Sequence, residues 1–194
     1  MSDLLFDHIN QHISLDRKDF PSILSFFCVQ QVKKKENLLA EGQYCKANYF
    51  VTKGCLRMFF TDDNGTEHTI QFALEHWWMT DIEAFNKGKK ASFAIQAIES
   101  GEVLAIDKQS QEKLLALHPE MERYFRMVYE RAYAASLFRV KYIFHLSKDK
   151  FYALFNQRYP EFVQRVPQKI LASFLGFTPE YLSELRKKLA SKKK

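Results

Sequence analysis

The side chains best suited to chemistry lie near the end of the chain, where acidic, hydroxyl and basic groups alternate with leucines. At about 100° per residue, a helix here would gather its leucines on one side. Those leucines are Leu182, Leu185 and Leu189. The opposite side would carry Glu180, Ser183, Glu184 and Lys187, flanked by Arg186 and Lys188. Such groups suit base edges and phosphates, so the pattern predicts a helix that binds double-stranded DNA in the major groove.

The residues around Gly176 predict how that helix begins. A glycine can take the left-handed conformation that ends a preceding helix, here the segment from Gln168 to Leu175. Thr178 can cap the next helix, with Pro179 at its first position. The expected DNA-binding residues are therefore Thr178, Pro179, Glu180, Ser183, Glu184, Arg186, Lys187 and Lys188. An ordinary helical hairpin in a bundle is the alternative, and Glu184 would cost affinity beside phosphates unless it reads a base.

The net charge supports a polyanionic partner. The formal charge of the chain is +6, and residues 164–194 account for all of it, with eight basic residues against Glu180 and Glu184. A neutral body with a basic end is typical of proteins that dock their C-terminus on nucleic acid. Lys192, Lys193 and Lys194 would add attraction that does not depend on DNA sequence, although a solvated lysine tail has the same composition.

The rest of the chain predicts an α+β fold. Residues up to about Phe27 have a helical pattern, and short strand-like runs follow from Val29 to Ile106, with a hairpin signal at Asn64-Gly65. Many short strands at such spacing favour an antiparallel barrel or jelly roll. We expect a sensor domain over residues 1–116, a linker helix over 117–146 and an all-α, winged-helix-like domain with the helix-turn-helix over 147–194. In the last domain, Tyr159-Pro160 and Val166-Pro167 are expected boundaries between three or four short helices.

The linker helix has an apolar stripe about seven turns long. Its members recur at steps of three and four: Met121, Phe125, Val128, Ala132, Ala135, Phe138, Tyr142 and His145. The stripe could pack on its own barrel, but a helix of this length more naturally pairs with its twin in a homodimer. Arg139 lies near the stripe and breaks a strict heptad, so a leucine zipper is not expected.

Several classes of protein are disfavoured. The start of the chain carries acids, and no run is long enough to span a membrane, which indicates a cytoplasmic protein without a membrane partner. The three cysteines form no C-x-x-C pair. His8 and His12 share a helix face but have no third ligand, while His68 and His76 are isolated. We therefore expect no metal, no cofactor and no enzyme; a cupin-like metalloenzyme on the jelly roll is the catalytic alternative.

The order of these parts resembles the Crp/Fnr transcription regulators, most closely the short forms of Bacteroidetes-type bacteria. Residues 49–57, YFVTKGCLR, look like the family's strand-turn-strand "Y-x-V-x-x-G". Residues 165–169, RVPQK, and 175–180, LGFTPE, look like its helix-turn-helix. The resemblance implies a cyclic-nucleotide-type sensor domain, a dimer helix, a base-reading Glu180 and RNA polymerase as a candidate partner.

The resemblance also implies an effector pocket, but one that departs from the cyclic AMP pattern. The family's glycine-glutamate pair becomes Met79-Thr80-Asp81, and its arginine-serine pair becomes Ala91-Ser92, so the phosphate-binding arginine is missing. Lys89 or Lys90 would have to replace it. Candidate ligand-binding residues are Trp78, Thr80, Asp81, Lys90, Ser92 and Ser136, with Trp77 beside them. These residues could equally be barrel core, and a regulator acting through protein contacts without DNA is the remaining alternative.

Overall fold

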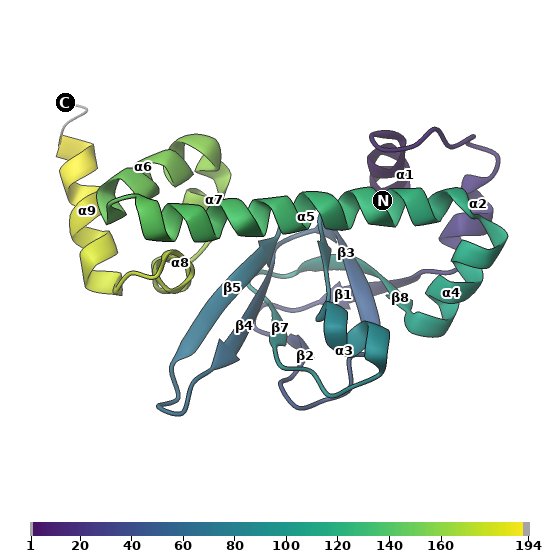
Figure 1. The fold of residues 1–194 in the computed structure, drawn as a ribbon, viewed down its shortest axis with the longest axis horizontal. Coiled ribbons are helices and arrows are strands. Elements are labelled where there is room, and N and C mark those ends of the chain that lie inside the picture. Colours follow the sequence, from purple (N-terminus) through teal and green to yellow (C-terminus); the bar gives the residue numbers. More distant parts are fainter. Residues whose placement is uncertain (1, 192–194) are drawn as a thin grey trace. The chain divides into compact units, whose positions relative to one another are not determined.

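The computed structural model describes residues 2–191, and their contacts divide the chain into two compact units (Figure 1). The first unit comprises Met1–Phe60 and Ile70–Arg131, and the second comprises Thr61–Thr69 and Ala132–Lys194. The chain therefore enters the second unit twice, once briefly at residues 61–69 and once to its end. In the described part of the chain, no helix combines the length and the apolar character needed to cross a bilayer.

Two antiparallel four-stranded sheets form the barrel predicted from the strand pattern. The first has the strand order β1-β8-β3-β6 and the second the order β2-β7-β4-β5. The strands are β1 (Cys28–Val32), β2 (Asn37–Leu39), β3 (Ala47–Lys53), β4 (Leu56–Thr61), β5 (Glu67–Ala73), β6 (Trp78–Met79), β7 (Ala94–Ala97) and β8 (Gly101–Asp107). In the centre of the first sheet, Phe50 pairs with Leu104 and both are buried. This arrangement confirms the predicted jelly roll.

The helices of the first unit pack mainly on the face of the first sheet that carries Phe50, Leu104 and Ile106. They are α1 (Ser2–Asn10), α2 (Phe20–Leu24), α3 (Ile82–Lys87), α4 (Lys108–Leu117) and the first part of α5 (Glu120–His145). The N-terminal segment is thus two short helices separated by a loop, and not the single helical stretch to Phe27 that the pattern predicted. Pro21 lies in the first turn of α2, where a proline is tolerated, and residues 11–19 before it are not helical.

Tyr124 joins three elements in the core of the first unit. Its hydroxyl accepts a hydrogen bond from Nε1 of Trp78 at 2.8 Å and lies 2.7 Å from Nδ1 of His8. Because the indole can only donate, the tyrosine proton is available to a neutral His8. Burial, together with the nearby charges of His12, His76 and Arg131, lowers the pKa of His8 from its ordinary 6.5 to about 4. His8 is therefore a buried neutral acceptor that fastens α1 to α5.

The hairpin predicted at Asn64-Gly65 is present between β4 and β5. Gly65 has a φ of +77°, but Asn64 is not among the residues with positive φ. The Asp62 side chain explains the difference, because its Oδ1 accepts hydrogen bonds from the amides of Asn64 and Thr66 at 3.0 and 2.9 Å. This turn is held by an aspartate and needs only one left-handed residue.

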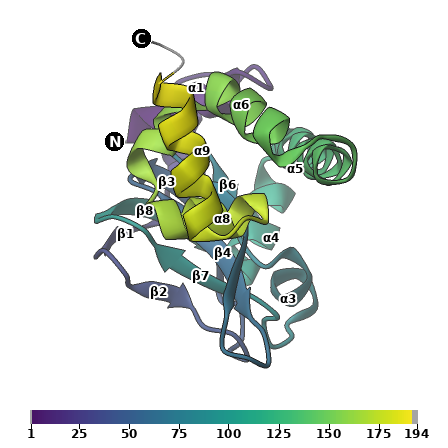
Figure 2. The ribbon, with the colours of Figure 1, turned by 90° about the vertical axis from the view of Figure 1, so that its left-hand side faces the viewer.

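Where the sequence predicted three or four short helices after the linker helix, the second unit contains four (Figure 2). They are α6 (Lys148–Arg158), α7 (Pro160–Arg165), α8 (Gln168–Leu175) and α9 (Pro179–Ser191). Tyr159-Pro160 and Val166-Pro167 separate the first three, as the proline positions predicted. Within residues 132–191 no strand accompanies these helices, so the domain is all-α over its described length.

The 26-residue helix α5 confirms the long helix predicted from the apolar stripe. Met121 and Phe125 at its start are buried in the core of the first unit, as the barrel-packing alternative required for that half. Beyond Arg131 the most exposed apolar side chains are Tyr133, Leu137, Phe138, Val140, Ile143 and Phe144. Four of them, Tyr133, Leu137, Val140 and Phe144, follow each other at steps of four, three and four. This exposed stripe is displaced by one or two positions from the predicted one.

Candidate nucleic-acid interface

The turn between α8 and α9 has the geometry of a glycine-terminated helix followed by a capped one. Gly176 has a φ of +73°, the left-handed conformation predicted for it. The amide of Phe177 bonds to the carbonyl of Ala172 at 2.9 Å, and that of Gly176 bonds to the carbonyl of Ser173 at 3.2 Å. These two bonds are those of a Schellman motif, which also buries Phe177. The chain is thereby turned sharply between the two helices.

The start of α9 is fixed by three side chains. Thr178 Oγ1 accepts a hydrogen bond from the amide of Tyr181 at 3.2 Å, which confirms the predicted threonine cap. Gln168 at the start of α8 donates from Nε2 to the carbonyl of Pro179 at 3.0 Å. Tyr181 donates its hydroxyl to Asp149 of α6, and this hydrogen bond to the carboxylate raises the pKa of Tyr181. The first turn of α9 is therefore held against both α8 and α6.

The two sides of α9 differ as the sequence predicted. Leu182 and Leu185 are buried, and Leu189 is half-buried. Glu180, Glu184, Lys187 and Lys188 are exposed, whereas Ser183 and Arg186 are partly exposed. Thr178 is exposed and Pro179 partly so, at the same end of the helix. All eight residues predicted to contact DNA thus have accessible surface on one continuous segment, while Lys192, Lys193 and Lys194 lie outside the described residues.

The end of α8 is held by two contacts that sequence reasoning missed. Ser173 Oγ donates to the carbonyl of Glu67 and accepts from the amide of Thr69, both at 2.9 Å. Arg139 of α5 donates from Nη2 to the carbonyl of Phe174 at 2.6 Å. Both contacts join residues 35 or more positions apart, and no local pattern in the sequence could have predicted them.

The residues predicted to bind a ligand in the barrel do not form one common site. Trp78 is a core residue bonded to Tyr124, and Trp77 is exposed. Thr80 donates to the carbonyl of Ala47 at 3.0 Å and lies 3.3 Å from Sγ of Cys45. Lys90 is exposed and Ser136 lies on the exposed part of α5 in the second unit. Asp81 and Ser92 do contact each other directly, through the amide of Ser92.

Asp81 is buried and its carboxylate is fully engaged with the backbone. Oδ1 accepts from the amide of Ala84 at 3.1 Å and caps α3, while Oδ2 accepts from the amide of Ser92 at 2.9 Å. A cyclic nucleotide would bring a phosphate anion, which needs free donors or a cation when it leaves water. Here the amides are bonded to an internal carboxylate, and Lys89 and Lys90 are exposed to solvent. The residues present do not fit a cyclic nucleotide phosphate at this place.

Catalytic and metal chemistry find little support in the described residues. No three His, Cys, Asp or Glu side chains in that part of the chain are placed to hold one metal ion. His68 donates from Nε2 to Oδ2 of Asp62 at 2.8 Å within the hairpin, and His76 belongs to the group of histidines around His8. Neither histidine is placed as the predicted cupin alternative would need.

The sequence profile of the cyclic nucleotide-binding domain family matches residues 29–118. Searching curated proteins gives no match. Among solved structures, FixK2 from Bradyrhizobium japonicum is similar, with 16% identity, a TM-score of 0.70, and coverage of 86% of this chain and 85% of that one. The c-di-GMP responsive global regulator CLP of Xanthomonas campestris has 13% identity, a TM-score of 0.68, and coverage of 91% and 93%. The catabolite activator protein of Thermus thermophilus has 19% identity, a TM-score of 0.56, and coverage of 92% and 85%.

Proposed function

We propose that this chain is a homodimeric transcription regulator that binds double-stranded DNA. The premise is its Crp/Fnr regulator fold, with a sensor of the cyclic nucleotide-binding domain family. In this proposal α9 is the recognition helix, and RNA polymerase is the further partner that regulation of transcription implies. The chain has no catalytic role.

The observation that carries the proposal is the division of α9 into a buried leucine side and an accessible polar side. Every surface helix has a polar outer side, but on α9 that side combines groups that can read base edges with an arginine and lysines, at the basic end of the chain. Glu180 and Ser183 are of a size and chemistry that reads base edges, and Lys187 and Lys188 suit phosphates. The capped and braced start of α9 would hold this face in a fixed register on the groove.

Dimerisation is supported by the exposed stripe of α5. Tyr133, Leu137, Val140 and Phe144 repeat at the 3.5-residue period of a coiled coil, and Phe144 is 87% exposed. Exposed apolar side chains in this number on one helix mark an interaction surface. A second copy of the same helix is self-complementary to such a stripe across a two-fold axis. The proposed dimer would present two recognition helices to two half-sites roughly 34 to 36 Å apart.

The effector of this regulator is proposed to be a molecule other than cyclic AMP. Support comes from Asp81, whose carboxylate bonds to the amides of Ala84 and Ser92, and from the missing arginine. The signal would reach the DNA through a change in the population of dimer-helix arrangements.

The test is selection of bound fragments from a pool of random duplexes by the purified full-length protein, followed by fluorescence anisotropy on the enriched sequence. The proposal predicts an inverted repeat and an affinity for it at least about a thousandfold above that for random duplex. Enrichment of no sequence at moderate salt would contradict it. That result would favour the alternative regulator that acts through protein contacts without DNA.

A further inference from the structure

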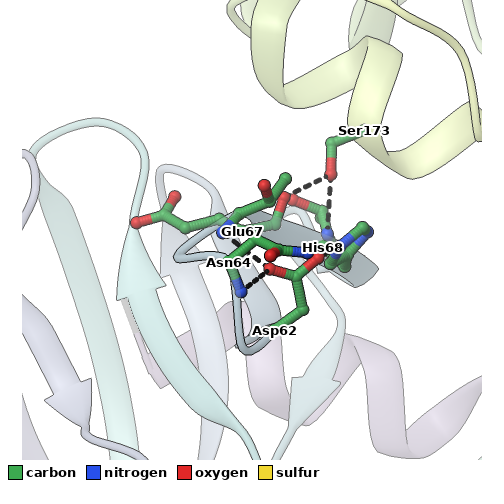
Figure 3. Close-up of polar contacts among 7 residues, drawn as sticks. Asp62, Asn64, Glu67, His68 and Ser173 are labelled. Atoms are coloured by element: carbon green, nitrogen blue, oxygen red, sulfur yellow. Dashed lines mark hydrogen bonds and ion pairs between the residues drawn. The ribbon is translucent and has the colours of Figure 1, made fainter.

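The hydroxyl of Ser173 bonds to backbone groups at the free edge of strand β5, where a further strand would otherwise pair (Figure 3). β5 is the outermost strand of its sheet, with β4 on one side only. In a strand, the carbonyl of one residue and the amide two residues later point to the same edge. At the free edge of β5 these groups belong to Glu67 and Thr69, and both bond to Ser173 Oγ at 2.9 Å. One hydroxyl therefore satisfies a donor and an acceptor that would otherwise face an open edge.

A short hydroxyl side chain is suited to this pair of bonds, because one atom is both donor and acceptor. The hydroxyl donates to Glu67 and accepts from Thr69 at the same time, which neither an alanine nor an amide nitrogen could do. Thr69 is 1% exposed, so water has little access to replace the bond to its amide. Loss of the hydroxyl would leave a poorly hydrated amide without a partner, which is a costly state.

The hairpin end that Ser173 contacts is stabilised by its own hydrogen bonds. Asp62 Oδ1 accepts from the amides of Asn64 and Thr66, and Oδ2 lies 2.8 Å from Nε2 of His68. The hydrogen bond from His68 is the largest of the causes that lower the pKa of Asp62. These bonds hold residues 61–69 in one defined turn conformation. By their contacts, residues 61–69 belong to the second unit.

The neighbour of Ser173 is braced from another direction. The Phe174 carbonyl accepts the hydrogen bond of Arg139, whose guanidinium also lies 4.3 Å from the centre of the Phe174 ring. Two consecutive residues of α8 are thus tied to two different elements, Ser173 to β5 and Phe174 to α5. Ser173 also takes part in the Schellman turn that leads into α9, because its carbonyl accepts from the amide of Gly176.

We propose that Ser173 is a positioning residue through which the hairpin end at residues 61–69 sets the direction in which α9 is presented to DNA. The proposal rests on the proposed function, and it assigns to a hairpin far away in sequence a part in DNA recognition. The barrel strands β4 and β5 continue directly into this hairpin end. A displacement along these strands would therefore reach α8 through Ser173 as well as through the dimer helix.

The experiment compares Ser173→Ala and Ser173→Thr with Ser147→Ala in the full-length protein. Ser147 precedes α6 in the same unit, is exposed and makes no side-chain cap, so it is a matched loss of a hydroxyl. Amide hydrogen exchange measures the bond to Thr69, amide chemical shifts of residues 180–188 report the setting of α9, and anisotropy measures affinity for the selected sequence and for random duplex.

For Ser173→Ala we expect exchange at Thr69 to accelerate by at least about tenfold and the shifts of residues 180–188 to move. Affinity for the selected sequence should fall about five- to tenfold, with affinity for random duplex changed less than about twofold. Ser173→Thr keeps the hydroxyl, so its exchange at Thr69, its shifts at residues 180–188 and its affinity for the selected sequence should be close to those of the wild type. Ser147→Ala should match the wild type. A double-mutant cycle with Asp62→Ala should show coupling, because both changes loosen the same contact.

The outcomes separate this inference from the proposed function. Unchanged exchange at Thr69 in Ser173→Ala overturns the contact. Faster exchange with unmoved shifts at residues 180–188, or equal losses of affinity for selected and random duplex, shows a purely structural serine and overturns the positioning role. If the wild-type chain selects no sequence, the proposed function fails, whereas the exchange and shift measurements still decide whether Ser173 sets α9.

Discussion

Arg139 donates a hydrogen bond to the carbonyl of Phe174 at 2.6 Å and stacks its guanidinium on the ring of the same residue. The residue that interrupts the heptad of the long helix therefore has a structural purpose, because it ties α5 to the end of α8. A cation near the carbonyl end of a helix also interacts favourably with the helix dipole. Burial lowers the pKa of the guanidinium, which nevertheless stays charged at any ordinary pH.

Replacement of Arg139 by alanine should destabilise the second unit by about 1 to 3 kcal/mol, since it removes a charge-assisted hydrogen bond and a cation–π contact. Urea denaturation followed by circular dichroism measures this loss. Lys141→Ala, on the exposed surface of the same helix, should change the free energy of unfolding by less than about 0.5 kcal/mol. Equal losses of stability in the two variants would contradict the stabilising role of the Arg139–Phe174 contact.

Leu137→Glu should abolish the dimer. A charge at the centre of the exposed apolar stripe would face its own copy across the two-fold axis, where like charges repel and an ionised carboxylate is desolvated. Sedimentation velocity should show a dimer for the wild type and a monomer for the variant. Gln109→Glu on exposed α4 adds the same charge elsewhere and should remain dimeric. A wild-type chain that sediments as a monomer at micromolar concentration refutes the pairing of α5.

The stability of the first unit should depend on pH through His8. Its pKa is about 4 in the folded chain, against an ordinary value of 6.5, so the unfolded chain binds more protons between these values. Stability is therefore full above pH 6.5 and declines as the pH falls toward 4. His8→Gln should flatten this decline, measured as the melting temperature from pH 7 to 4.5, whereas His145→Gln at the exposed end of α5 should not. A variant with an unchanged profile would show that other groups cause the decline.

Asp81→Ala should destabilise the first unit by about 1 to 3 kcal/mol, because α3 loses its cap and the amide of Ser92 loses its acceptor. Asp63→Ala, an exposed carboxylate in the β4–β5 hairpin, is the control and should be nearly neutral. With the wild type, millimolar cyclic AMP should leave the melting temperature unchanged. A rise of several degrees would mean that the nucleotide binds and that the assignment of Asp81 is wrong.

Local signals in the sequence were sufficient for the helix-turn-helix. Gly176, Thr178 and Pro179 act through their own backbone or the next few residues, so the predicted turn and cap are present where expected. The proline positions between α6, α7 and α8 likewise predicted the boundaries. The strand pattern was sufficient for the barrel, because alternating runs and turn residues are also local features.

Features that depend on distant contacts could not be predicted in this way. The exposed stripe of α5 was displaced because helical steps of three and four admit neighbouring stripes over seven turns, and burial against the barrel decides between them. Part of the predicted stripe instead meets α6, with the rings of Tyr142 and Phe151 6.1 Å apart. The role of Asp81 as an internal anion depends on where the loop before β7 passes. The contacts of Ser173 and Arg139 have no signature in their neighbouring residues.

The central claim is that α9 reads base edges, and selection from random duplexes with three proteins tests it most directly. Wild type, Glu180→Gln and the triple variant Lys192→Ala, Lys193→Ala and Lys194→Ala would each be sequenced after enrichment. We expect Glu180→Gln to change the preferred base at one position of each half-site. The triple variant should keep the preferred sequence and weaken binding to all duplexes, with a smaller dependence on salt. The same enriched sequence with Glu180→Gln as with the wild type, and an equal loss of affinity in both variants, would contradict the central claim.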